Sequence, residues 1–134
     1  MTRAASDDST LLALFAAEAH GHLGRIEAAV ASLGQGADRS ALDTILDALH
    51  TLAGAARSVE VLEFEWLCRA LELAFGAARD AGAAILPRES IAAAIALAPQ
   101  LIGQPAGRVR NQALALCAQL NALAARPAQP SASL

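Results

Sequence analysis

The sequence contains no lysine and no tyrosine, and its aromatic residues are three phenylalanines and one tryptophan. All positive charge therefore comes from ten arginines, which are spread along the chain without forming a basic run, and the net charge is −3. Affinity for nucleic acid depends on a clustered positive surface that neutralises phosphates. The scattered arginines and the negative net charge therefore argue against a nucleic-acid partner.

Long apolar runs and metal-binding cysteine patterns are also missing. Glu18 and His20 interrupt the first apolar run, so neither a signal peptide nor a membrane-inserted segment is expected. The two cysteines, Cys68 and Cys117, lie in helical patterns without metal-ligand spacing, and we expect both to be reduced and packed. His20 and His22 are two residues apart and point to different sides of a helix, so no metal site is expected. These features predict a cytoplasmic protein.

Alanine dominates the composition, whereas β-branched residues are few. Because alanine is the best helix former, helix is the expected structure throughout. A chain of 134 residues is long enough for one domain with a single core. Apolar residues recur at steps of three and four in five segments with short connections. We predict an all-α fold, in which an up-and-down antiparallel four-helix bundle is followed by a fifth, C-terminal helix.

Capping residues, glycine and proline predict where these helices begin and end. The expected helices run from Asp8 or Ser9 to Gly34, from Asp38 or Ser40 to residues 57–58, from Ser58 to residues 80–82, from Pro87 to Ile102, and over residues 107–125. Pro99 should kink the fourth helix or end it early, because it removes a backbone donor. Residues 1–7 are expected to form a disordered lead, residues 8–125 the bundle domain, and residues 126–134 a linker or disordered tail. The change in composition after Ala125 suggests one module of a longer polypeptide.

One histidine lies at the edge of an apolar stripe in the second expected helix. The stripe consists of Leu42, Ile45, Leu49, Leu52 and Ala56. His50 follows Leu49 and is therefore expected to be half exposed. Gly54 lies one turn further along and costs roughly 1 kcal/mol relative to alanine inside a helix. We interpret Gly54 as leaving room beside His50 for another backbone or for a partner.

A carboxylate is expected to face this histidine across a helical hairpin. The second and third helices should turn near residues 57–60, and Glu72 lies near the position that mirrors His50 across the turn. A carboxylate there would accept a hydrogen bond from Nδ1 of His50 and leave Nε2 outward as a nucleophile. It would also stabilise the positive charge that develops on the ring when Nε2 attacks. The spacing thus predicts a reactive histidine supported by a carboxylate.

Residues 49–56 read Leu-His-Thr-Leu-Ala-Gly-Ala-Ala and resemble the histidine phosphotransfer (Hpt) motif, His-x-x-Lys-Gly followed by a small residue. Leu71-Glu72 matches the carboxylate that partners the phosphorylatable histidine in the chemotaxis kinase form of this domain. Phe15-Ala-Ala-Glu18 and Leu23-Gly-Arg-Ile26 are similar to the first helix of the family. The chain therefore resembles an Hpt domain in three separate segments.

The resemblance covers about residues 9–103, and the helix expected over residues 107–125 is similar to the N-terminal phosphotransfer domain of CheA-type chemotaxis histidine kinases. It implies that His50 accepts a phosphoryl group from a histidine kinase catalytic domain and passes it to an aspartate of a CheY-like receiver domain. It also implies that the kinase partner binds ATP and Mg²⁺ and that the receiver binds Mg²⁺, with no cofactor in this domain. The chain shows no Gly-rich nucleotide loop, so it is not expected to be a kinase by itself. We expect a monomeric domain.

The sequence departs from the family motif at the lysine, which is Ala53 here. That lysine helps to balance the phosphoryl charge in the family, so a replacement must be an arginine or must come from a partner. Arg57 lies two turns beyond His50 on the same face, and Arg69 lies one turn before Glu72. Either guanidinium suits phosphate oxygens, and we favour Arg57.

Several alternative interpretations stay open at this point. Without the motif, His50 is an ordinary edge-of-core histidine and Glu72 a solvated helix carboxylate. Ala53 keeps open a degenerate Hpt-like adaptor that binds signalling partners without carrying phosphate. A free-standing Hpt shuttle and a helical assembly module joined through the fifth helix are further alternatives. Trp66 is expected either to cover the fourth or fifth helix or to bind a partner.

Overall fold

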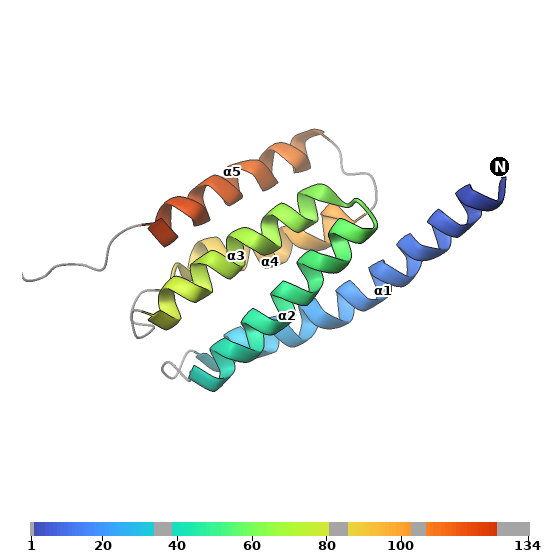
Figure 1. Ribbon diagram of the computed structural model, residues 1–134. Coiled ribbons are helices and arrows are strands. Elements are labelled where there is room, and N and C mark those ends of the chain that lie inside the picture. The colour runs from blue at the N-terminus through green and yellow to red at the C-terminus, as the bar shows by residue number, and fades with distance from the viewer. Residues whose placement is uncertain (1, 34–38, 81–85, 103–106, 126–134) are drawn as a thin grey trace, which may run out of the picture.

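Five α-helices and one short 3₁₀ helix form the described part of the chain, which contains no strand. The computed structural model describes residues 2–33, 39–80, 86–102 and 107–125, with side chains from Thr10 onward. The elements are α1 (Thr2–Ser32), α2 (Arg39–Ser58), α3 (Leu62–Asp80), α4 (Arg88–Leu97), η2 (Ala98–Leu101) and α5 (Gly107–Ala125). Successive α-helices run in alternating directions (Figure 1), which confirms the predicted all-α, up-and-down bundle.

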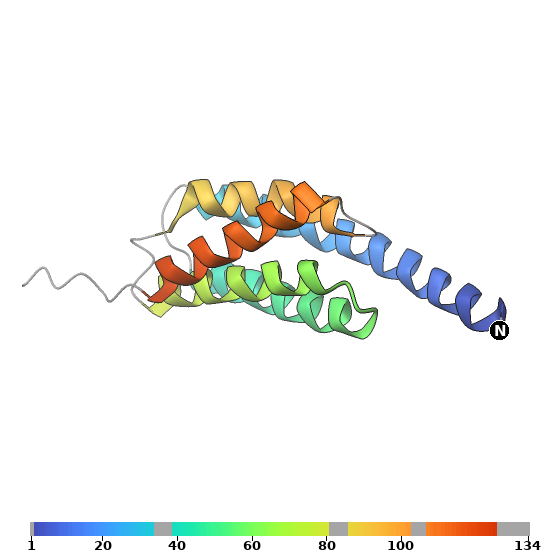
Figure 2. The ribbon, with the colours of Figure 1, turned by 90° about the horizontal axis from the view of Figure 1, so that it is seen from above.

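The helical hairpin of α2 and α3 forms the centre of the molecule. α1 packs against α2, whereas α5 packs against α3 and α4. Seen from above, α1 and α4 lie in one layer and α2 and α3 in the other, with α5 crossing beside α3 and α4 (Figure 2). The predicted fifth helix is therefore present, and it covers the side of the bundle away from α1.

Apolar stripes from the helices meet in one core. All five predicted stripe residues of α2 are buried, and so are Val61 before α3 and, within α3, Phe64, Leu67, Leu71, Ala74, Phe75 and Ala78. Phe15 of α1 contacts Phe64 of α3 edge to face, with ring centroids 5.4 Å apart. This contact ties α1 to the hairpin, so the orientation of the hairpin faces is fixed by packing.

Both cysteines are free and buried, as the sequence predicts. Burial, with a smaller contribution from the Glu72 carboxylate, raises the pKa of the Cys68 thiol to about 12. Burial also raises the pKa of Cys117. Both thiols are therefore protonated at neutral pH and are poor nucleophiles.

The helix boundaries agree with the sequence in most places and differ at the start of α1 and at the start of α3. α1 begins at Thr2, so the lead expected over residues 1–7 is helical from Thr2 and the cap expected at Asp8 or Ser9 is wrong. No proline interrupts Thr2–Ser32, and its alanine-rich first turns favour helix. Pro99 lies in the first turn of η2 directly after α4 ends, which confirms that it ends the fourth helix early. The predictions for Gly34, Asp38, residues 81–82 and residues 126–134 concern residues that the structure does not describe.

The turn between α2 and α3 differs from the prediction that Ser58 caps the third helix. Ser58 Oγ instead donates to the Gly54 carbonyl, at 3.1 Å, within α2. The α2 end is closed by two backbone bonds, from Val61 N–H to the Ala56 carbonyl at 2.9 Å and from Glu60 N–H to the Arg57 carbonyl at 3.1 Å. This is the Schellman pattern, which requires a left-handed residue at its centre. Glu60 occupies that position, with φ of 62°.

Replacing Glu60 by glycine should raise the free energy of unfolding by about 0.5–1 kcal/mol, because glycine adopts the left-handed conformation without a Cβ penalty. Urea unfolding of the two proteins measures this difference. Glu27→Gly is the control, since Glu27 is exposed within α1 and its replacement should lower stability by about 1 kcal/mol. A Glu60→Gly protein that is less stable than the wild type would contradict this account of the turn.

Candidate functional site

His50 lies on α2 with 75% of its side chain exposed. Its neighbours in the sequence and along the helix, Leu49 and Leu52, are buried at 0% and 1% exposure. These buried residues fix the rotation of α2 about its axis, so the imidazole is held at the boundary between core and solvent. The sequence predicts a half-exposed histidine, and the structure exposes it further.

The α2–α3 hairpin brings Glu72 to His50. His50 Nδ1 lies 3.2 Å from Glu72 Oε2, and the Glu72 side chain is 22% exposed. A neutral imidazole carries a proton on one nitrogen only, and a carboxylate can only accept a hydrogen bond. The contact with Glu72 therefore places the proton on Nδ1. Nε2 then keeps its lone pair. The predicted contact is present, and it provides a nucleophilic nitrogen on an exposed ring.

Arg69 lies behind Glu72 and is engaged by two carboxylates. Its Nη1 donates to Glu72 Oε1 at 3.4 Å, and its Nε donates to Glu65 Oε2 at 3.4 Å. Glu65 is buried at 8% exposure. Glu65 is not among the residues predicted from the sequence, although its spacing of four residues from Arg69 on one helix indicates a contact between the two side chains. Arg69 is therefore committed within the chain, which makes it a weaker candidate for binding phosphate.

Ala53 and Gly54 lie side by side on α2 but in different environments. Ala53 is buried at 0% exposure, so the position of the family lysine faces the core here. Gly54 is exposed, and a Cβ built on it would meet no atom within 4 Å. The packing of this chain therefore does not require a glycine, and the space beside His50 is open to solvent.

Arg57 occupies the last turn of α2 and is exposed. Within the part of the chain that the structure describes, its guanidinium makes no hydrogen bond or ion pair. It lies about 10 Å along the helix axis from His50, at 1.5 Å per residue. Helical side chains tilt toward the N-terminus, which is the direction of His50 from Arg57. Its charge thus stays available for an external anion.

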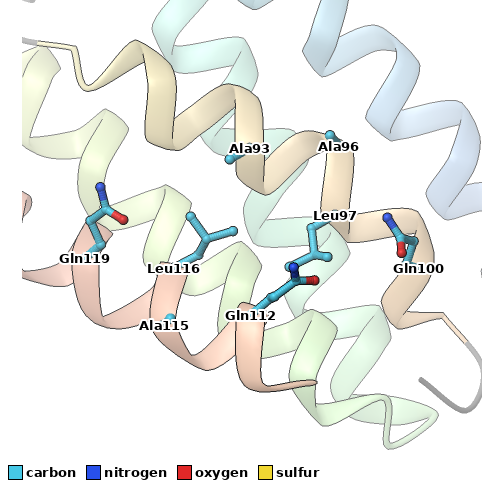
Figure 3. Close-up of a pocket in the computed structure, with 8 residues that line it drawn as sticks. All are labelled: Ala93, Ala96, Leu97, Gln100, Gln112, Ala115, Leu116 and Gln119. Carbon is cyan, nitrogen blue, oxygen red and sulfur yellow. The ribbon is translucent and has the colours of Figure 1, made fainter. Parts of the chain in front are cut away.

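Two grooves flank α5. The first, of about 430 Å³, lies between α3 and α5 and is lined by Trp66, Leu73, Leu114 and Arg69, among others. Trp66 is 43% exposed there, so it lies beside α5 without being fully covered. The second, of about 460 Å³, lies between α4 with η2 and α5 and is lined by alanine, leucine and glutamine side chains (Figure 3). It has no ionisable lining residue and offers no acid–base chemistry.

No group of three or more histidine, cysteine, aspartate or glutamate side chains in the described part of the chain could hold a metal ion. No described helix is both long and apolar enough to cross a membrane. His20 and His22 both lie on α1, where His22 Nδ1 lies 3.4 Å from Arg25 Nη2.

Comparison with known proteins agrees with the geometry at His50. The sequence matches the Hpt domain family over residues 10–126, a range that includes the α2–α3 hairpin and α5. No curated protein and no solved structure matches the chain. The family match spans well over half of the 134 residues. The chain therefore belongs to the Hpt domain family, whose members carry out histidine phosphotransfer in phosphorelays and interact with kinases and response regulators.

Proposed function

We propose that His50 is the phosphoryl acceptor of this Hpt domain and that it passes the group to an aspartate of a receiver domain. The observation that carries this proposal is the exposed imidazole whose Nδ1 lies 3.2 Å from Glu72 Oε2. Neither of the other two histidines has a carboxylate partner among the described contacts. His50 thus combines access for a protein partner with a defined tautomer.

The chemistry uses few groups of this chain. The lone pair of His50 Nε2 forms an N–P bond with the γ-phosphorus of ATP, while the P–O bond to ADP breaks and its electron pair leaves with ADP. The ring becomes cationic, retains its proton on Nδ1, and is stabilised by Glu72. In the second step an aspartate oxygen forms an O–P bond, and the N–P electron pair returns to Nε2. ATP and Mg²⁺ are held by the partners, so the domain needs only positioning and charge.

Arg57 is the proposed cation for the phosphoryl group on His50. The motif lysine is replaced by the buried Ala53, and Arg69 is engaged by Glu65 and Glu72. Arg57 has no such engagement among the described residues. A guanidinium can donate two hydrogen bonds to phosphate oxygens. The Arg57 side chain is expected to tilt toward the N-terminus of α2, which is the direction of His50.

For the wider context we propose a CheA-like chemotaxis kinase acting in the cytoplasm, with this domain as its phosphoacceptor module. α5 supports that context, because it packs on α3 and α4 as an addition to the four-helix bundle. The partner surface would be small and centred on His50 and Gly54, as for a transient signalling contact. A free-standing shuttle uses the same chemistry. The buried Ala53 favours a second candidate, an adaptor that binds partners without carrying phosphate.

The test is phosphorylation by a histidine kinase catalytic domain and ATP, followed by addition of a receiver domain. The proposal predicts acid-labile, base-stable phosphate on the chain and its loss to the receiver. A chain that binds the receiver but takes no phosphate from kinase domains that label a reference Hpt domain would establish the adaptor instead.

Replacing Gly54 by alanine should make the domain more stable and, at the same time, slow phosphoryl transfer from His50 to a receiver. The change should stabilise α2 by about 0.5–1 kcal/mol, since the added Cβ meets no atom within 4 Å. Transfer to a receiver should slow by about ten- to a hundredfold, because a methyl group beside His50 displaces the docked partner. Urea unfolding measures the change in stability. The rate at which phosphorylated protein loses its phosphate to an added receiver domain measures the change in transfer.

Two controls belong to this experiment. Gly24→Ala on α1 is the matched control for stability, because Gly24 is exposed and has open space around its Cβ position. Labelling by the small donor phosphoramidate should be the same in Gly54→Ala and wild type. An unchanged rate of transfer to the receiver would show that Gly54 does not provide clearance for a partner.

A further inference from the structure

The carboxylate that supports His50 is itself held by a second pair of side chains. Glu72 Oε2 lies 3.2 Å from His50 Nδ1, whereas Glu72 Oε1 accepts a hydrogen bond from Arg69 Nη1 at 3.4 Å. Arg69 Nε donates to Glu65 Oε2 at 3.4 Å. We propose that Arg69 and Glu65 are positioning residues, which hold Glu72 so that His50 keeps its proton on Nδ1 and its lone pair on Nε2. The inference rests on the proposed role of His50.

Glu72 needs such support because its own rotamer does not fix its carboxylate. The terminal torsion of glutamate is broad, and the Glu72 side chain is 22% exposed, so water can compete for its oxygens. Arg69 occupies Oε1 and leaves Oε2 for the imidazole. Neutral histidine in water favours the proton on Nε2, which would block the nucleophile. The orientation of Glu72 therefore determines how much of His50 is reactive.

Arg69 in turn depends on Glu65. The Arg69 side chain is 41% exposed, and a long exposed side chain has many alternative rotamers. Glu65 is buried at 8% exposure, and a buried carboxylate requires a charged or hydrogen-bonding partner. Each residue thus restricts the other, at a spacing of one helical turn. Lysine cannot replace Arg69, because two separate nitrogens of the planar guanidinium reach the two carboxylates.

The charges of this cluster also matter for the phosphoryl step. Two carboxylates and one guanidinium leave one net negative charge behind the imidazole. That negative charge faces the His50 ring when the ring becomes cationic. The positive charge of Arg69 offsets the repulsion between the carboxylates of Glu65 and Glu72. The structure assigns Arg69 to this internal role and leaves phosphate binding to Arg57.

The experiment compares Arg69→Lys, Glu65→Ala and Glu65→Gln with the wild type in two readouts that need no partner protein. Nitrogen NMR of His50 reports the tautomer, and phosphoramidate labelling reports the reactivity of Nε2, with ammonia as the leaving group. Arg69→Lys and Glu65→Ala should raise the Nε2–H population and slow labelling of His50 by about three- to tenfold. Glu65→Gln should retain most of the rate, because its amide oxygen still accepts from Arg69 Nε.

Arg79→Lys is the matched control. Arg79 lies on the same helix and also contacts two carboxylates, with Nη1 3.3 Å from Asp43 Oδ1 and Nε 3.5 Å from Asp80 Oδ1. It should leave both readouts at His50 unchanged. If Arg69→Lys and Glu65→Ala match Arg79→Lys in tautomer and rate, the positioning role is wrong. The tautomer is read without any phosphate, so this failure is distinct from a failure of the kinase assay.

Discussion

Replacing His50 by glutamine should abolish acid-labile, base-stable phosphorylation of the chain. Glutamine is similar in size and polar, but its amide nitrogen has no available lone pair to attack phosphorus. The His50 side chain is 75% exposed, so the replacement should leave the unfolding midpoint nearly unchanged. Labelling with a kinase catalytic domain and ATP measures the first effect, and urea unfolding measures the second.

The other two histidines provide the control for this result. His20→Gln and His22→Gln remove imidazoles from α1, where the described contacts include no carboxylate partner, and both proteins should be labelled like the wild type. Equal labelling of the His50→Gln protein would exclude His50 as the acceptor, whatever its geometry.

Replacing Glu72 should give the second large effect. Glu72→Ala removes both the hydrogen bond to His50 Nδ1 and the negative charge behind the ring, and it should slow phosphorylation of His50 by about a hundredfold. Glu72→Gln keeps an acceptor atom and loses only the charge, so we expect about a tenfold reduction. Single-turnover kinetics at saturating kinase separates these effects from weaker binding.

Glu63→Gln is the matched control for Glu72→Gln. Glu63 lies on the same helix, its side chain is 15% exposed, and its Oε2 accepts from Arg110 Nε at 2.7 Å. Loss of that charge should alter the contact between α3 and α5 without changing the rate at His50. A Glu72→Ala protein that is phosphorylated as fast as the wild type would remove Glu72 from the mechanism.

The apolar pattern was sufficient to predict the fold and the central contact of the site. Stripes at three- and four-residue steps determine which face of each helix is buried, and short connections determine the alternating direction. Once α2 and α3 form a hairpin, the positions of His50 and Glu72 relative to the turn place them opposite each other. A local argument predicts that Pro99 kinks the fourth helix or ends it early, because proline removes a backbone donor.

The features that were missed depend on the orientation of individual side chains and on backbone detail. The engagement of Arg69 by Glu65 requires the rotamer and the burial of both residues, which a helical pattern does not specify. The sequence predicts Ser58 as the cap of α3, but its hydroxyl donates to the Gly54 carbonyl and the turn is closed by a left-handed Glu60. The sequence shows Ala53 as a departure from the motif, whereas its complete burial follows only from the packing of α2.

The central claim is that the phosphoryl group is carried by Nε2 of His50. The most direct measurement is to phosphorylate the wild-type chain, map the modified residue by mass spectrometry under basic conditions, and assign the linked nitrogen by phosphorus NMR. The account predicts a single phosphohistidine at His50 with the phosphorus on Nε2, since Nδ1 is occupied by the hydrogen bond to Glu72. Phosphate on His20 or His22, or on Nδ1 of His50, would contradict it.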